Sequence, residues 1–173
     1  MYNSPHFELS EESAVHDAMD RCGLAHFVTW TGEELVSTAL PLFLVRDEGE
    51  HGTLYGHFAK ANTQWSAPVK GEALAIFPHL DAYVTPSWYA TKAETGKVVP
   101  TWNYELIHAY GLPLFFQDEN RLLEVVTSIT KQHEGERKTP WEVADAPADF
   151  IRSQFGALLA FACPSHACKE SAR

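Results

Sequence analysis

The spacing of apolar residues changes from a helical to an extended pattern near Gly23. Before it, Val15, Met19 and Cys22 fall near one face of a helix, and glycine is typical of the position just after a helix end. Ser10 is the expected N-cap, because its hydroxyl can accept a hydrogen bond from the first turn. After Gly23, β-favouring runs alternate with polar, glycine-containing turns, which predicts strands. We expect these strands at residues 25–30, 35–45 and 53–58.

The rest of the chain combines further extended runs with two helices. We expect strands at residues 72–77, 98–110 and 112–116, and a loop at residues 93–97. Pro86 excludes a central strand just before it, since proline has no N–H for a sheet ladder. One helix is expected to begin near Asp118, and Pro147 can open another that runs to about Leu159. Short strands with helices only at the start and end predict a mainly β (α+β) fold, a small barrel with flanking helices.

Composition narrows the class of protein. The chain has 173 residues, of which 45% are hydrophobic and 21% charged, as in an ordinary globular domain. Its formal net charge is −10, so we expect no tight DNA binding by this chain alone and no attraction to a membrane. No run approaches the ~18 apolar residues of a membrane span, and no leader pattern opens the chain. Its three cysteines, an odd number, fit the reducing cytoplasm, where we expect it to work.

One segment near the end of the third expected strand carries clustered donors. Gly56 allows a close backbone approach, and His57, Lys60 and Asn62 offer donors within a few residues. Clustered donors with a lysine suit a phosphate group. A lysine on a solvated surface would look the same, so the residues alone leave both interpretations open.

Two later segments mix bulky aromatic residues with small hydroxyl and amide groups. A flavin needs such an environment, with apolar walls for its rings and a few polar groups for its edge. Aromatic residues make up 12% of the chain, which suits flat-ring binding, a large interface or a Trp-rich core. Cross-strand aromatic pairs in a barrel would show the same pattern. The candidates are Ser87, Trp88 and Tyr89 in the earlier segment, and Thr101, Trp102 and Asn103 in the later one.

No motif indicates a metal centre or a catalytic site. Cys163, His166 and Cys168 have loose spacing and no second ligand pair nearby, so a frayed tail explains them better than zinc. Phosphate-loop, dinucleotide-binding and nucleophile-elbow motifs are missing. We expect no metal and assign no catalytic residue; His108 is the least poor candidate for a proton donor beside a flavin.

Five separated motifs occur together in this chain, from residue 1 to about residue 159. They are the opening Met-Tyr-x-x-Pro-His-Phe, then Gly-His-Phe-Ala-Lys-Ala-Asn, Gln-Trp, Pro-Ser-Trp-Tyr and Val-Pro-Thr-Trp-Asn-Tyr. In order and approximate spacing they resemble the PaiB family of FMN-binding negative transcriptional regulators. That family is similar to the pyridoxamine-phosphate-oxidase-like split barrels, which bind flavin mononucleotide (FMN) at a dimer interface. The resemblance implies a split β-barrel, FMN as cofactor and a homodimer.

The resemblance also implies roles for the candidate residues. Lys60 would bind the phosphate at the end of the third strand. The three candidates of the later aromatic segment would lie on one strand facing the flavin, and those of the earlier segment would shape the pocket or the dimer contact. His57 and Asn62 are further pocket candidates.

Two places depart from the family pattern. Thr38-Ala39-Leu40-Pro41 stands where the family has Thr-His-Leu-Pro, so a candidate pocket imidazole is missing. The family's closing strand, with a Gly-Lys-x-Lys-Leu-Ser-Gln-Asn-like segment, also has no counterpart. We therefore expect one split-barrel domain over residues 1–162 and a divergent tail over residues 163–173.

The hypothesis from sequence is an FMN-binding, PaiB-like transcriptional regulator that partners with itself and with a flavin. One rival is a flavin-dependent oxidoreductase of the pyridoxamine-phosphate-oxidase-like type, because a fold does not fix a function. The other is a dimeric interaction protein without cofactor, which the altered carboxyl terminus favours.

Overall fold

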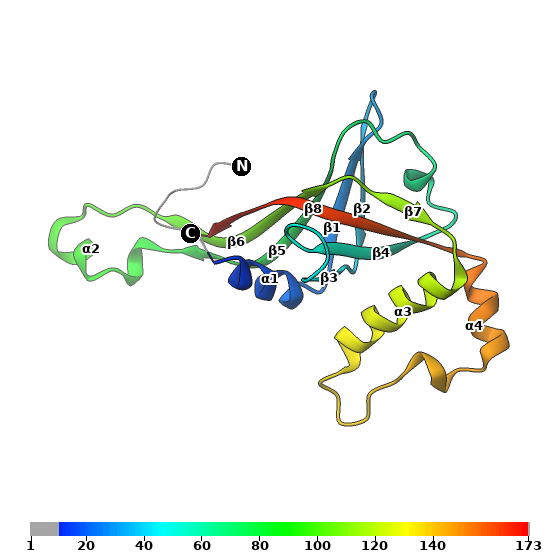
Figure 1. Ribbon diagram of the computed structural model, residues 1–173. Coiled ribbons are helices and arrows are strands. Elements are labelled where there is room, and N and C mark those ends of the chain that lie inside the picture. The colour runs from blue at the N-terminus through cyan, green and yellow to red at the C-terminus, as the bar shows by residue number, and fades with distance from the viewer. Residues whose placement is uncertain (1–10, 173) are drawn as a thin grey trace.

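The chain forms an extended antiparallel sheet flanked by helices (Figure 1), so the expected mainly β class is confirmed. This computed structural model describes residues 11–172, with side chains described up to residue 169; Ser10 lies outside them. The strands are β1 (Ala25–Trp30), β2 (Leu35–Leu40), β3 (Phe43–Val45), β4 (Thr53–Ala59), β5 (Ala73–Val84), β6 (Thr101–Gly111), β7 (Leu114–Phe116) and β8 (Leu158–Ala172). The helices are α1 (Glu12–Arg21), α2 (Ala90–Thr95), α3 (Glu119–Glu134) and α4 (Ala148–Phe155), with 3-10 turns η2 (Thr63–Trp65), η3 (Pro86–Trp88) and η4 (Val143–Asp145).

The sheet order is β2-β1-β5-β6-β8-β4-β3, and β7 also pairs with β8. Each of these pairings is antiparallel. β4 and β7 both pair with residues 160–162 of β8, so they lie on its two sides, and β6 pairs with its later residues. β8 therefore joins the two halves of the sheet.

The expectation that the chain lacks a closing strand is wrong. β8 continues across the expected boundary at residue 162 and pairs with β6 as far as Ala172. The family motif is absent here, but the alternation needed for a strand is present, since Ser165 is buried and His166 is exposed. Without β8, the facing edges of β4 and β6 would lose the partners of their N–H and C=O groups.

Side-chain hydrogen bonds join β2, at one end of the sheet order, to the segment after β4. Gln64 is only 1% exposed, and its Nε2 donates to the carbonyls of Phe27 at 3.0 Å and Val36 at 3.2 Å. Thr38 Oγ1 donates to Gln64 Oε1 at 2.6 Å. A buried amide that satisfies its donors and acceptor in this way fixes the spacing between the elements it bridges.

The main core is aromatic. Phe161 on β8 packs against Phe27, with ring centroids 4.4 Å apart, and against Phe58, at 5.1 Å. A second cluster lies under α3, where Leu122 and Val125 pack with Ala160 of β8. β8 thus contributes to both cores, one on each face.

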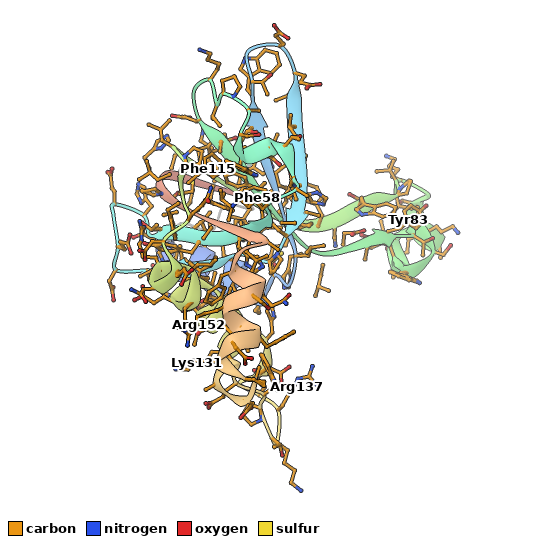
Figure 2. The ribbon with its side chains drawn as sticks, turned by 90° about the vertical axis from the view of Figure 1, so that its right-hand side faces the viewer. Phe58, Tyr83, Phe115, Lys131, Arg137 and Arg152 are labelled. Carbon is orange, nitrogen blue, oxygen red and sulfur yellow. The ribbon has the colours of Figure 1, made fainter. Side chains whose placement is uncertain are left out.

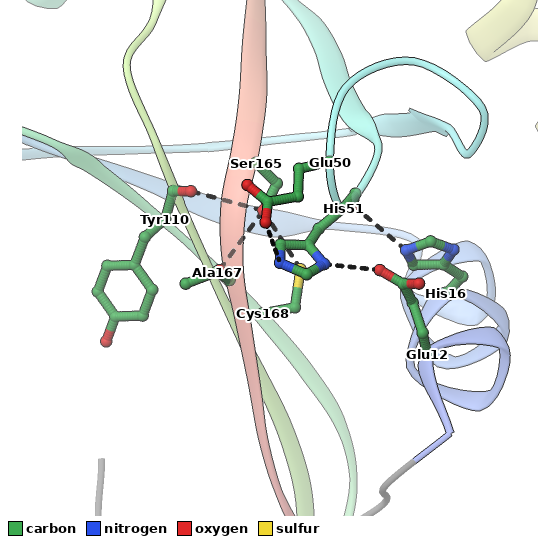
Figure 3. A network of polar contacts seen from close by, with 8 residues as sticks. All are labelled: Glu12, His16, Glu50, His51, Tyr110, Ser165, Ala167 and Cys168. Carbon is green, nitrogen blue, oxygen red and sulfur yellow. Dashed lines mark hydrogen bonds and ion pairs between the residues drawn. The ribbon is translucent and has the colours of Figure 1, made fainter.

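α1 is held against the body by polar contacts around the loop before β4 (Figure 3). His51 Nδ1 lies 2.7 Å from Glu12 Oε1, and His16 Nε2 lies 3.2 Å from the His51 carbonyl. Arg46 adds bonds to two carboxylates of α1, Asp17 at 2.6 Å and Asp20 at 2.5 Å. None of the described helices is long and apolar enough to cross a membrane.

The outer parts of β5 and β6 form an arm that extends away from the body (Figures 1 and 2). We use "the arm" for residues 79–104, which include η3 and α2. A register shift between Pro78 and Asp81 marks its base. No residue between Phe77 and Ile107 is buried. A two-stranded ribbon of this length is only marginally stable by itself in water.

Four local expectations need correction. Residues 35–45 form two strands, because Pro41 and Leu42 interrupt the run after β2. Pro86 begins η3 without ending β5 early, so β5 extends through Tyr83 and Val84. Residues 93–97 are largely helical, and Gly96 at φ 66° stops α2. The last helix ends at Phe155, before β8 begins.

Gly111 offers a test of the β6–β8 junction. A Cβ there would meet the backbone carbonyl of Pro164 and lie 2.8 Å from Cys163 Sγ. Gly111→Ala should therefore lower the free energy of unfolding by about 1–3 kcal/mol, as overpacking does. Gly23→Ala is the control, since nothing lies within 4 Å of a Cβ at that position. Urea titration of both variants would contradict this account if they were equally stable.

Candidate functional site

The candidate residues form two groups at opposite ends of the sheet (Figure 1). His57, Lys60 and Asn62 lie on β4 and in the turn after it, and the other six lie on the arm. The end of β4 pairs with the first residue of β8, whereas the base of the arm pairs with its last. An extended strand of this length spans about 45 Å at ~3.3 Å per residue. One chain therefore does not bring the two groups around one flavin.

Lys60 is fixed by its backbone and leaves its ammonium group free. Its N–H donates to the Ala157 carbonyl at 2.7 Å, and its own carbonyl accepts from Trp65 Nε1 at 3.0 Å. The side chain is exposed and makes no ion pair with any residue that the structure describes. A free ammonium on a fixed backbone suits a phosphate, which it meets as a point charge.

His57 holds an unused polar atom inside the protein. The residue lies on β4 opposite Ala160, and its Nδ1 is buried without a hydrogen-bond partner among the described residues. Burial lowers the pKa of this imidazole, which favours the neutral form. A buried polar atom without a partner is uncommon, and a bound ligand is one way to supply the missing partner.

Asn62 has a structural role in the turn after β4. Its Oδ1 accepts from the Gln64 N–H at 2.8 Å, and its Nδ2 donates to Thr38 Oγ1 at 2.8 Å. The side chain therefore caps η2 and joins the network around Gln64. These bonds use its carbonyl and one amide hydrogen, which leaves at most one donor for a ligand.

The earlier aromatic segment forms the tip of the arm. The Ser87 N–H is capped by Thr85 Oγ1 at 3.3 Å, and Ser87 Oγ accepts from Lys92 Nζ at 3.1 Å. Trp88 is 72% exposed and Tyr89 is 43% exposed. The tip is thus locally ordered by hydrogen bonds, but none of the residues that the structure describes covers its aromatic side chains.

The later segment does not present its three residues to one side. Thr101, Trp102 and Asn103 are consecutive on β6, and successive side chains of a strand point to opposite faces. Thr101 and Asn103 therefore share one face of the arm. Trp102 lies on the other, where Nε1 donates to Asp81 Oδ1 at 2.9 Å and the ring lies 6.0 Å from that of Tyr83.

Two relevant residues were not among the candidates. Gln64 follows the donor-rich segment and organises the turn that carries Lys60; only its place in a motif hinted at this. His26 lies directly opposite Ala39, so an imidazole is present one strand away from the position where the family histidine is missing. His108, the weak candidate for a proton donor, lies on β6 with Nδ1 3.4 Å from Tyr110 OH, and burial lowers the pKa of its imidazole.

Known proteins of similar sequence point to one family. Residues 1–164 match the family model described as "Putative FMN-binding domain". The Bacillus subtilis protease synthase and sporulation protein PAI 2 is 28% identical over 81% of this chain and 65% of its own length. Uncharacterized proteins of Aspergillus fumigatus and Saccharomyces cerevisiae are 37% and 33% identical over 58% and 56% of this chain. They match over 51% and 57% of their own lengths, so the chain spans about half of these curated relatives.

Solved structures of low sequence identity share the fold. The FAD and heme binding protein of Mycobacterium smegmatis has a TM-score of 0.70 at 15% identity, over 95% of this chain and 72% of its own. The flavocytochrome Anf3 of Azotobacter vinelandii has a TM-score of 0.67 at 15% identity, over 97% and 70%. The fold is thus the split β-barrel, as expected. Because the family model covers nearly the whole sequence, the chain belongs to this family of FMN-binding domains.

Proposed function

We propose that this chain binds FMN in sites built from two copies, each combining the arm of one chain with the β4 end of the other. The observation that carries this proposal is that the arm extends away from the body and contains no buried residue. Membership of the FMN-binding family and likeness to flavin-binding structures support the choice of ligand. A second copy related by a two-fold axis would cover both arms at once and create two identical sites.

Apolar exposure on the arm supports a partner chain. Six of its large apolar side chains are exposed by 43% to 77%, whereas stable interfaces bury such residues at their centre. They are Leu80, Tyr83, Trp88, Tyr89, Val99 and Trp102. A flavin needs flat apolar walls, and these residues supply them once the arm lies against another chain.

The proposal assigns different polar residues to the phosphate, the ribityl chain and the ring edge of FMN. In this proposal Lys60 meets the phosphate, with neutral His57 as a nearby polar contact. Thr101 and Asn103, on one face of the arm, supply hydroxyl and amide groups for the ribityl chain or the ring edge. Ser87, Trp88, Tyr89 and Trp102 shape the contact between the chains, and Asn62 acts through the turn that it caps. When bound, FMN would supply redox and light-absorbing chemistry that no side chain has.

We also propose that the chain serves as a regulator in the cytoplasm and does not itself bind DNA tightly. The likeness to PAI 2 supports the regulatory role, and three free cysteines suit a reducing compartment. The net charge of −10 disfavours direct contact with phosphates of a duplex. We therefore expect no sequence-specific mobility shift at nanomolar protein. A salt-dependent shift at that concentration would overturn this part of the proposal.

Lys60 provides the test of FMN binding. The phosphate carries nearly two negative charges, and a charged hydrogen bond is worth about 1.5–3 kcal/mol, so Lys60→Ala should weaken FMN binding about 10- to 100-fold. Riboflavin lacks the phosphate, and its affinity should barely change. Flavin fluorescence titration measures both, with Lys138→Ala as a control on a distant loop. Equal losses for FMN and riboflavin would show that Lys60 has only a structural role.

A further inference from the structure

A groove on the side of the molecule away from the arm lies between α3 and α4 (Figure 2). The loop that joins the two helices, including η4, forms its third wall. Its volume of about 910 Å³ lies within the ~300–1,000 Å³ typical of small-molecule sites. Apolar side chains form most of the wall, and they include Leu123, Trp141, Val143, Ile151 and Phe155.

The two carboxylates in the groove are already used by the protein. Glu134 Oε1 lies 3.0 Å from Arg137 Nε, and its Oε2 accepts from the Trp141 N–H at 3.1 Å. The Glu142 side chain accepts from the backbone N–H of Asp145 and so caps η4. Both acids hold the loop in place; Arg137 balances the charge of Glu134, whereas Glu142 keeps its negative charge.

The two cations of the groove have no such partners. Lys131 on α3 and Arg152 on α4 are exposed and make no ion pair or side-chain hydrogen bond with any described residue. Figure 2 shows both beside the helices that form the groove. Lys131 and Arg152 are therefore positive charges without an ion-pair partner among the described residues, in a chain whose net charge is −10.

We propose that this groove binds a small carboxylic acid with an apolar body, of the medium-chain acyl class. The carboxylate lies against Arg152, whose planar fork of donors matches it, and Lys131 adds a second positive charge. The acyl chain lies along the wall formed by Leu123 and Ile151. Such a ligand satisfies the two features of the groove together, since an uncharged lipid would leave the cations unused and a small ion would leave the apolar wall exposed.

This site is separate from the proposed flavin site. The groove uses no residue of the arm and none of His57, Lys60 and Asn62. It is, however, next to that region, because α4 leads directly into the Ala157 carbonyl that binds the Lys60 N–H.

Calorimetric titration with octanoate tests the proposal, with octan-1-ol as the uncharged comparison. We expect one octanoate per chain and weaker binding of the alcohol. Arg152→Gln should weaken octanoate about 3- to 10-fold, a charged contact discounted for exposure, and leave the alcohol unchanged. Leu123→Asp, at a 39% exposed position, should abolish binding of both. Lys138→Gln and Leu112→Asp are matched controls outside the groove.

The same titration repeated with saturating FMN separates the two sites. Unchanged octanoate affinity supports a separate groove, whereas displacement by FMN would place the acid in the flavin site and overturn the proposal. Equal affinity for acid and alcohol, or an equal effect of the control substitutions, would also overturn it. If no acid binds and Leu123→Asp changes the sedimentation coefficient, the groove is a protein contact instead.

Discussion

The hydrogen-bond ladder of β8 is the constraint on which the rest of this structure depends. Along its fifteen residues β8 pairs first with β4 and β7 and then with β6, so it joins the two halves of the sheet. Its apolar residues enter both cores: Phe161 packs with the barrel aromatics and Ala160 lies beneath α3. Loss of this strand would leave two open sheet edges and divide the main core.

The length of β8 also limits which candidate residues one chain can bring together in a single site. Because the strand is extended, the turn with Lys60 and the base of the arm lie at its two ends. Residues that the sequence suggests for one ligand are thus held apart by a rigid element. The arm meanwhile carries aromatic surface that none of the described residues covers. The proposed second copy, which brings its arm to the far end of the first, would account for both observations.

Local pattern allowed much of the fold to be predicted. The first helix follows from apolar spacing, although its N-cap position is Glu11, which makes no side-chain cap bond. The third follows from apolar spacing and its cap, since Asp118 accepts from the Arg121 N–H at 2.9 Å. β8 was missed because its residues were compared with a family motif, while a strand requires only alternation and an available edge. β5 was predicted too short, because the strand continues past Pro78 into the arm. The register shift after Pro78 marks a bulge, which accommodates the proline within the strand.

The candidate site could be predicted only in part. Lys60 and His57 have the free charge and the unused buried atom expected of ligand contacts. Asn62 is used by the η2 cap, and Trp102 faces away from Thr101 and Asn103, which strand alternation alone could have shown. The groove between α3 and α4 has no local signal, since its walls come from two helices and a loop that meet only in the folded chain.

The central claim, that one flavin site takes residues from two chains, is tested most directly with mixed dimers. One chain carries Lys60→Ala, the other carries Thr101→Ala with Asn103→Ala, and two different affinity tags isolate the heterodimer. If the arm of one chain serves the β4 end of the other, one site contains all the substitutions and the other none. The account predicts one tight FMN per heterodimer, although neither parent homodimer binds tightly. A heterodimer without any tight site would show that each site takes these residues from a single chain, and would contradict the account.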